Sequence, residues 1–221
     1  MNITNDLVTE YINHRYRPLS SRLGHLRQIG EQDNVPIILK ETESFLNMVL
    51  ALKRPKKILE VGTAIGYSAL YFAESCEDAE IYTIEKNEYA ARSARHNIAA
   101  AGLENRIHSL FGDGQEQIEK LRDQGIDGFD FVFIDAAKSH YKRFFDAAIA
   151  LCEENALIIS DNILQRAMTV SDQFDINGKH KTNIKKMREY VDYICSDRTL
   201  DTTLMSIGDG IAVSIYRGEN G

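Results

Sequence analysis

Side chains that could do chemistry follow two apolar stretches in the second half of this 221-residue chain. The first stretch, residues 129–134, runs directly into Asp135, and Lys138 lies close behind. A second apolar stretch ends directly before Asp161 and Asn162. Carboxylate and amide oxygens are ligands of hard divalent cations, and such a cation can hold an oxygen nucleophile. These residues therefore predict a cation site with an ammonium group beside it.

A second group of candidate residues lies upstream. Residues 58–67 indicate a strand that runs into a turn, where Gly62 lets a ligand approach the backbone and Gly66 permits tight packing at a helix start. About twenty residues further on, a second predicted strand ends on Glu85, where an acid can accept hydrogen bonds from both ribose hydroxyls. Asp113, after a third strand, could receive the exocyclic amine of adenine. Together they predict a nucleoside-cofactor site beside the cation site.

The spacing of the glycines argues against a phosphate cradle. Gly62 and Gly66 do not have the Gly-x-Gly-x-x-Gly spacing of a dinucleotide turn, and the chain has no Gly-Lys-Ser/Thr loop. A cofactor that is held through its phosphates is therefore disfavoured.

Short apolar runs alternate with segments of helical periodicity from residue 56 onward. The predicted strands are 57–61, 80–84, 107–111, 129–134 and 156–160. This alternation predicts right-handed crossovers and a parallel sheet that is covered by helices on both faces. The last two β-rich runs, 202–207 and 211–216, flank a Gly-Asp-Gly turn and predict an antiparallel hairpin at the end of a seven-stranded α/β sheet.

The first part of the chain has a different pattern. Apolar residues at helical spacing predict two helices before the first strand and a third after Pro36. We expect one domain over residues 1–221, with an N-terminal helical cap at 1–55 and a sheet core at 56–221. Ligands of such sheets bind beyond the carboxyl ends of the strands, where the candidate residues fall.

Composition favours a cytoplasmic protein that does not enter a membrane. Of the residues, 43% are hydrophobic and 27% are charged, and no apolar run approaches the roughly 18 residues of a membrane span. The N-terminus lacks the pattern of a signal peptide. The chain has three widely spaced cysteines, Cys76, Cys152 and Cys195. Their odd number and spacing predict reduced thiols.

The charge is unevenly distributed. A net charge of −7 argues against sequence-independent coating of nucleic acid, which needs a broad basic field. Two segments, 11–30 and 176–188, nevertheless carry basic residues and no acid. They can be solvated helix faces or local patches for an anionic substrate, and the sequence leaves both interpretations open.

In these motifs the chain resembles the S-adenosylmethionine-dependent methyltransferases. More narrowly, it resembles the cation-dependent O-methyltransferase family that includes catechol and caffeoyl-coenzyme A O-methyltransferases. The motifs that carry this resemblance are Val-Pro-Ile-Ile at 35–38, Glu-Val-Gly-Thr-Ala-Ile-Gly-Tyr-Ser at 60–68, residues 129–138 and Ser-Asp-Asn at 160–162. Residues 135–141, Asp-Ala-Ala-Lys-Ser-His-Tyr, look most like the bacterial tRNA 5-hydroxyuridine methyltransferases.

The resemblance implies a Rossmann-like class I methyltransferase fold, a homodimer and a role for each candidate residue. Mg²⁺ or another divalent cation would be held by Asp135, Asp161 and Asn162. Lys138 and Asp135 would be the catalytic residues, with Lys138 at the acceptor hydroxyl as a base or as an electrostatic group. S-adenosylmethionine would be bound by Ile38, Glu60, Gly62, Gly66, Ser68, Glu85, Asp113 and Asp135.

Three functions follow as hypotheses. The first is methyl transfer to the 5-hydroxyl of 5-hydroxyuridine at the wobble position of a tRNA anticodon loop, which gives 5-methoxyuridine. The alternative is a small-molecule enzyme that acts on catechols or phenolic coenzyme A esters. Both acceptors present two adjacent oxygens to a cation. The third, a non-catalytic binding protein, is disfavoured because it would have no need to gather these carboxylates. Residues 163–169, which shape the acceptor pocket in the family, follow its pattern only loosely.

Overall fold

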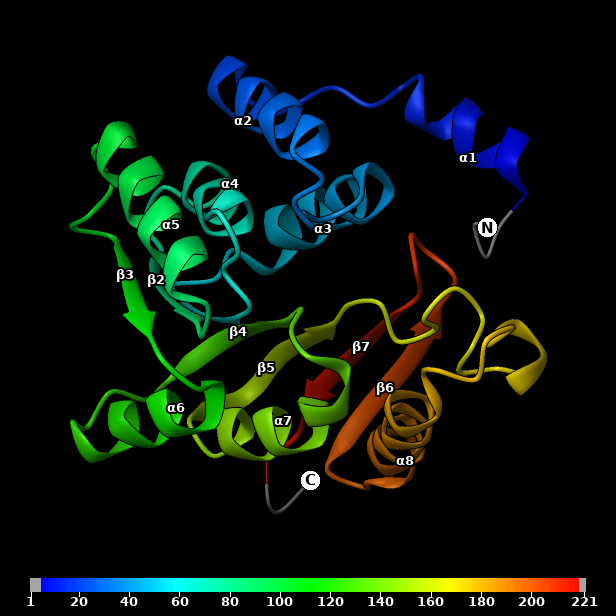
Figure 1. Ribbon diagram of the computed structural model, residues 1–221. Helices are drawn as coiled ribbons and strands as arrows, with labels where there is room; N and C mark the ends of the chain where they lie inside the picture. Colours follow the sequence, from blue (N-terminus) through cyan, green and yellow to red (C-terminus); the bar gives the residue numbers. More distant parts are fainter. Residues whose placement is uncertain (1–4, 219–221) are drawn as a thin grey trace.

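A seven-stranded sheet lies at the centre of the computed structural model, which describes residues 5–218 (Figure 1). The strands follow the order β3-β2-β1-β4-β5-β7-β6. Their bounds are β1 Lys57–Val61, β2 Glu80–Glu85, β3 Ile107–Phe111, β4 Phe129–Ile134, β5 Cys152–Ser160, β6 Leu200–Met205 and β7 Ile211–Tyr216. Strands β1 to β5 pair in parallel, whereas β7 is antiparallel to both β5 and β6. The predicted mixed sheet with a C-terminal hairpin is confirmed.

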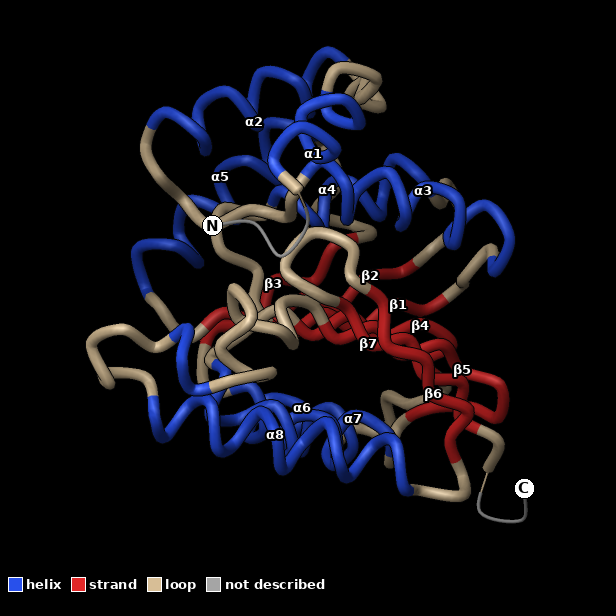
Figure 2. The backbone as a smooth tube through the Cα atoms, turned by 90° about the vertical axis from the view of Figure 1, so that its right-hand side faces the viewer, coloured by secondary structure: helices blue, strands red, loops and turns tan. Residues whose placement is uncertain are grey.

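Helices cover both faces of this sheet. Figure 2 shows α1 to α5 on one side and α6, α7 and α8 on the other. The helices are α1 Asp6–Asn13, α2 Ser21–Gln32, α3 Lys40–Lys53, α4 Tyr67–Ser75, α5 Glu88–Ala101, α6 Gly114–Asp123, α7 Tyr141–Ile149 and α8 Lys181–Ser196. Two 3-10 turns, η1 Lys138–His140 and η2 Asp172–Phe174, complete the elements. Within residues 5–218, no helix is both long enough and apolar enough to cross a bilayer.

The central strand β4 divides the core into two halves. All six of its residues are buried, and successive side chains point to opposite faces of the sheet. Phe131 and Phe133 pack edge-to-face on Phe72 of α4, with ring centroids 5.8 and 5.5 Å apart. Val132 and Ile134 belong to the cluster on the α7 and α8 side. Burial on both faces explains why every residue of the strand except Asp130 is apolar, and it fixes the position of the residue that follows the strand.

Two strands, β5 and β6, differ from their predicted bounds by more than one residue. Strand β5 begins at Cys152 rather than at residue 156, because its first part is exposed and polar and therefore carries no apolar signal. The pairing with β4 is irregular there, and Asn155 has a left-handed φ of 64°. Strand β6 covers 200–205 rather than 202–207. It lies at the sheet edge and only one of its six residues is buried, so hydrophobicity marks its ends poorly.

The N-terminal helices attach to the sheet unequally. Helix α1 has no buried residue, and its apolar side chains are exposed. Helices α2 and α3 are joined by a buried ion pair, in which Arg27 Nη2 lies 2.5 Å from Glu43 Oε2. Tyr67 of α4 donates to the same oxygen at 2.6 Å, and Tyr16 donates to Glu43 Oε1 at 2.7 Å. Arg27 also donates to the carbonyl of Ile38 at 2.9 Å. This Arg27–Glu43 cluster holds α2, α3 and α4 together.

Candidate functional site

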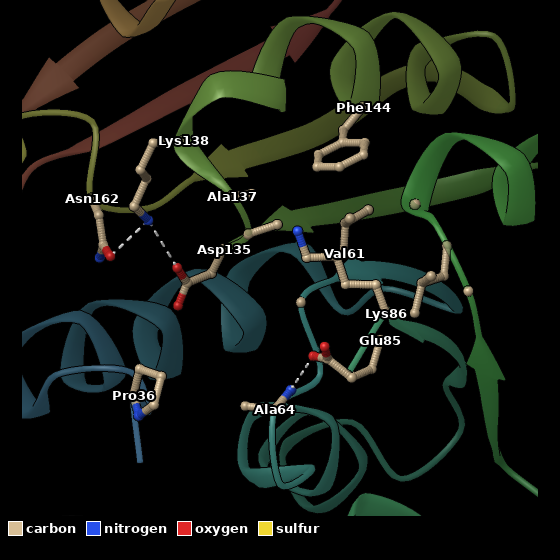
Figure 3. A pocket seen from close by; sticks show the side chains of 15 residues that line it. Pro36, Val61, Ala64, Glu85, Lys86, Asp135, Ala137, Lys138, Phe144 and Asn162 are labelled. Atoms are coloured by element: carbon tan, nitrogen blue, oxygen red, sulfur yellow. Dashed lines mark hydrogen bonds and ion pairs between the residues drawn. The ribbon is translucent and has the colours of Figure 1, made fainter. Parts of the chain in front are cut away.

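A cavity of about 330 Å³ opens at the carboxyl ends of β1, β2 and β4 (Figure 3). It lies where strand order reverses between β1 and β4, the expected place for a ligand in a sheet of this kind. Five of the predicted site residues line it: Gly62, Glu85, Asp135, Lys138 and Asn162. The structure thus brings together side chains from both halves of the predicted site.

Lys138 is the centre of one end of the cavity. Its Nζ donates to Asp135 Oδ1 at 3.2 Å, to Asn162 Oδ1 at 2.8 Å and to the Tyr141 hydroxyl at 3.0 Å. The Tyr141 hydroxyl in turn donates to the carbonyl of Asp161 at 2.8 Å. An ammonium has three N–H groups, so all three have partners here.

The charge state of Lys138 follows from these contacts. Burial alone would lower its pKa, but Tyr141 and Asp135 outweigh burial, and the net pKa lies above the ordinary lysine value. These contacts therefore favour the ammonium form of Lys138.

Asp161 is fully buried and incompletely satisfied. Its Oδ1 accepts from the backbone N–H of Asn162 at 2.7 Å, whereas Oδ2 is buried with no hydrogen-bond partner. Burial raises the pKa of the Asp161 carboxyl, and the charge of Asp135 raises it further. Asn162 has a left-handed φ of 56°, a conformation that asparagine tolerates better than most residues.

The oxygens at this end fit a hard divalent cation. Asp135, Asp161 and Asn162 offer two carboxylates and an amide, and the unpartnered Asp161 oxygen is one that a cation would satisfy. Among the described residues no group of three or more His, Cys, Asp or Glu side chains is arranged for a metal. A cation here would therefore also depend on the amide oxygen of Asn162 and on oxygens from substrate or water. The Lys138 ammonium already donates hydrogen bonds to Asp135 and Asn162, two of the three candidate ligands.

The middle of the cavity is formed by the turn after β1 and by the end of β2. Gly62 has φ 108°, and a Cβ atom there would lie 1.9 Å from the carbonyl oxygen of Asp135, so only glycine fits. Glu85 is anchored by backbone N–H groups, with Ala64 N at 2.9 Å and Asn87 N at 2.8 Å. The glycine thus lets the turn after β1 pack against the Asp135 backbone, beside a fixed carboxylate that lines the same cavity.

Four other predicted cofactor residues stand behind the cavity wall and do not line it. Glu60 is wholly buried in β1, accepts a hydrogen bond from Thr83, and has one buried oxygen without a partner. Burial raises the pKa of Glu60 to about 7, which hydrogen bonds from Ser68 and Thr83 only partly offset. Gly66 packs against α5, and the Ile38 carbonyl accepts from Arg27. A direct contact of these residues with a cofactor stays a prediction.

Asp113 also does not line the cavity, although its glycine neighbours do. Its carboxylate caps α6 by accepting from Gln115 N at 3.1 Å. Arg143 of α7 binds both oxygens, at 2.8 and 2.6 Å, and holds the pKa of Asp113 below its usual value. Sequence reasoning missed Arg143, because no spacing rule connects it with a residue on another helix.

Tyr141 was also missed as a site residue. Its helical spacing with Phe144 and Phe145 predicts a core face, and all three are indeed buried. The hydrogen bond between the Tyr141 hydroxyl and Lys138 adds a role that periodicity alone does not indicate.

The segment after Asn162 has unusual backbone geometry. Three consecutive non-glycine residues, Gln165, Arg166 and Ala167, have left-handed φ angles of 48°, 54° and 68°. Such residues cost roughly 1–2 kcal/mol each, so other contacts must hold the turn. Asp209 accepts from the Arg166 backbone N–H at 2.5 Å, and Arg188 donates to the Thr169 carbonyl at 2.7 Å.

These contacts bear on the two basic segments. Arg188 belongs to the support of this turn and pairs with Asp172, while Arg27 is buried against Glu43. Lys185 and Lys186 pair with Glu189 on the surface of α8. The basic segments are therefore in part structural. Lys179 and Lys181 are exposed, and they keep open the interpretation as a patch for an anionic substrate.

Comparison with known proteins gives a consistent picture. A family model described as O-methyltransferase matches residues 18–216. The O-methyltransferase imqG of Aspergillus flavus is 32% identical over 165 residues, which cover 73% of this chain and 66% of that protein. The catechol O-methyltransferase of Niastella koreensis is 27% identical over 78% of this chain and 79% of its own. A crystal structure from Staphylococcus aureus, provisionally named a caffeoyl-CoA O-methyltransferase, superposes with a TM-score of 0.87 at 31% identity, covering 95% of this chain and 99% of that one.

Proposed function

The chain belongs to the O-methyltransferase family, and from this premise we propose that it transfers the methyl group of S-adenosylmethionine to a hydroxyl oxygen with the help of a divalent cation. The observation that carries the proposal is one continuous cavity. At one end Lys138 joins Asp135 and Asn162, and Glu85 stands further along the wall (Figure 3). The reacting oxygen and the cofactor can therefore share one enclosure.

The volume of the cavity and the residues that line it support S-adenosylmethionine as the cofactor. Gly62 lines the cavity, and the Glu85 carboxylate on the same wall can accept hydrogen bonds from ribose hydroxyls. The cavity volume of about 330 Å³ lies within the range of small-molecule sites. The sulfonium methyl needs no acid for activation, so the protein must mainly align the acceptor oxygen with the methyl carbon.

The polar end of the cavity supports activation of the acceptor. Asp135, Asp161 and Asn162 would hold Mg²⁺ or another divalent cation, which supplies Lewis-acid activation and a lower pKa of the acceptor hydroxyl. Lys138 contributes a fixed positive charge that stabilises the developing oxyanion. The Tyr141 hydroxyl accepts a hydrogen bond from this ammonium and helps to hold it in place. The hydroxyl proton would pass to water. The acceptor oxygen then bonds to the methyl carbon as the carbon–sulfur bond breaks, and the sulfur leaves as the neutral thioether of S-adenosylhomocysteine.

For the acceptor we propose 5-hydroxyuridine at the wobble position of tRNA, converted to 5-methoxyuridine. Its support is the resemblance of residues 135–141 to tRNA 5-hydroxyuridine methyltransferases, together with the exposed Lys179 and Lys181. A uridine in an anticodon loop is single-stranded and can leave its stack at modest cost. The 5-hydroxyl and the neighbouring 4-carbonyl would offer adjacent oxygens to the cation.

Small catechols or phenolic coenzyme A esters are the alternative acceptors. The printed name of the Niastella relative, a catechol O-methyltransferase, favours this alternative. A catechol also presents two adjacent oxygens, so the polar end of the cavity would serve either substrate.

We also propose a homodimer in the cytoplasm. The exposed apolar side chains of α1 support the dimer, and the three free cysteines, Cys76, Cys152 and Cys195, support a reducing compartment. Analytical ultracentrifugation of the purified protein tests the oligomeric state.

The deciding experiment is transfer of a labelled methyl group from S-adenosylmethionine by the purified protein. The acceptors are tRNA that carries 5-hydroxyuridine, the same tRNA with uridine, and a panel of catechols and phenolic esters, each with Mg²⁺ or with chelator. Labelling of the hydroxylated tRNA alone, dependent on the cation, is expected. Labelling of the small phenols, with no label on the tRNA, would contradict the tRNA acceptor and favour the alternative acceptors. No labelling of any acceptor by a protein that binds the cofactor would contradict both.

A further inference from the structure

The end of the cavity opposite Lys138 is formed by a contact between two elements that are distant in sequence. Gly112 and Gly114, which flank Asp113 in the turn between β3 and α6, line it. Phe144 of α7 lines it as well. Figure 3 shows the Phe144 ring well apart from Asn162.

The turn and the helix are in direct contact. A Cβ atom at Gly114 would lie 2.7 Å from the Phe144 ring and 2.9 Å from Val61. Gly112 has φ 144°, and a Cβ atom there would meet the side chain of Gln117 at 2.4 Å. Small movements of this turn relative to α7 would therefore change the width of the cavity at this end.

Arg143 is the residue that fixes this distance. Its two terminal nitrogens bind the two oxygens of Asp113 at 2.8 and 2.6 Å, in the fork-like geometry that arginine makes with a carboxylate. Its guanidinium carbon also lies 4.7 Å from the centre of the Phe144 ring. Asp113 is at the same time the N-cap of α6. One side chain thus connects the cap of α6, the cavity-lining turn and α7.

The order of the lining residues along the cavity indicates which part of the cofactor would lie at this end. If the reacting methyl is at the Asp135 end and the ribose is at Glu85, the nucleobase extends past the end of β2 to the Gly112 and Gly114 turn. This assignment rests on the proposed function, because it takes S-adenosylmethionine as the ligand.

We propose that Arg143 is a positioning residue for the nucleobase of the cofactor: by holding Asp113 it keeps the β3–α6 turn against Phe144 and sets the width of the slot for the adenine. Lys138 has its own contacts with Asp135, Asn162 and Tyr141, none of which involves Arg143. Loss of Arg143 therefore weakens cofactor binding and leaves the chemical step nearly unchanged.

The test measures binding of S-adenosylhomocysteine by isothermal titration calorimetry, which needs neither acceptor nor cation. Arg143→Met removes both bonds to Asp113, whereas Arg143→Lys keeps the charge but not the fork. Lys142→Met is the matched control, since Lys142 precedes Arg143 on α7 and pairs with Asp146 on the surface. Asp113→Asn is the second route to the same loss, because asparagine remains a good N-cap but lacks the charge that Arg143 binds.

We expect Arg143→Met and Asp113→Asn to raise the Kd of S-adenosylhomocysteine roughly two- to fivefold, the range for a charged pair that is partly exposed. Arg143→Lys should lie between wild type and Arg143→Met, and Lys142→Met should match wild type. In a double variant the two losses should not add, because both remove the same contact. The KM for S-adenosylmethionine should rise with Kd, with kcat changed less than about twofold.

Two results would overturn the inference. One is an unchanged Kd in both Arg143→Met and Asp113→Asn. The other is a fall in kcat at unchanged Kd, which would assign Arg143 to the chemical step. If wild-type protein fails to bind S-adenosylhomocysteine at all, the proposed function fails first, so the two failures are distinguishable.

Discussion

The buried Arg27–Glu43 cluster makes a quantitative prediction for the stability of the fold. Arg27 is 5% exposed and Glu43 is 2% exposed. Replacing Arg27 by methionine keeps much of the side-chain volume but leaves the Glu43 carboxylate buried without its cationic partner. Such a change costs about 3–5 kcal/mol in comparable buried pairs.

The contacts of the cluster place the expected loss within that range. Tyr67 and Tyr16 still donate to Glu43 in the variant, and they reduce the cost of the unpaired charge. The hydrogen bond from Arg27 to the Ile38 carbonyl is lost as well, which adds about 1 kcal/mol. We therefore expect a decrease of about 4 kcal/mol in the free energy of unfolding. For a domain of this size the Tm should fall by roughly 8–16 °C.

Urea unfolding followed by circular dichroism measures the difference. Arg22→Met is the matched control, because Arg22 lies on the same helix and is 3.5 Å from Glu74 at the surface. It should change stability by less than about 0.5 kcal/mol. The double variant Arg27→Met with Glu43→Gln removes the buried charge and should recover a large part of the loss. The reasoning is refuted if Arg27→Met stays within about 1 kcal/mol of wild type, or if the double variant is no more stable than Arg27→Met alone.

Three further predictions concern the residues around the cavity. Burial raises the pKa of Glu60 from 4.5 to about 7, so its neutral form favours the folded state; this contribution is complete below pH 4.5 and is lost as the pH rises through 7. Glu60→Gln should therefore gain about 3 kcal/mol relative to wild type at pH 8 but little at pH 4.5, as measured by urea unfolding at both values, and an equal difference at both would contradict it. Gly62→Ala should destabilise the protein by more than about 3 kcal/mol, because its Cβ atom would meet the Asp135 carbonyl; Gly102→Ala, where the space is open, should cost only about 1 kcal/mol in the same assay. Removal of the cation with chelator should lower methyl transfer at least roughly hundredfold, yet leave binding of S-adenosylhomocysteine within a factor of about two; parallel loss of both would assign the cation to cofactor binding.

The sheet and the polar end of the cavity could be predicted from the sequence for one physical reason. Parallel strands end at the same edge of a sheet, so the residues after β4 and β5 had to come close together. The apolar run of β4 marked that edge clearly, because the strand is buried on both faces. Asp135 and Asn162 accordingly meet at Lys138.

Strand alternation also contained information that the sequence prediction did not use. Val61 lines the cavity, so its neighbour Glu60 must point to the opposite face of β1. Glu60 is indeed buried against Thr83 rather than directed toward the cavity. The position of Glu60 in the motif at residues 60–68 is therefore compatible with a role in supporting the β1 residues that line the cavity, without contact with the ligand.

Contacts between side chains on different helices could not be predicted. Arg27 appeared in the sequence as one of several basic residues in an acid-free segment, yet its partner Glu43 lies on the next helix. Arg143 and Asp113 are likewise brought together only when α7 packs beside α6. Such pairs depend on which helices pack together. Local periodicity predicts the buried face of a helix but not the helix that packs against it.

The position of β7 between β5 and β6 has a consequence for synthesis of the chain. Strand β5 pairs with β4 on one side, and its other side is covered only by β7. Until residues 211–216 have left the ribosome, a nascent chain exposes the unpaired backbone of residues 157–160, of which the first three are apolar. An open, apolar strand edge is a template for pairing with another chain. Release of the nascent chain before β7 is complete would therefore favour aggregation, even though the cavity residues up to Asn162 have all been made.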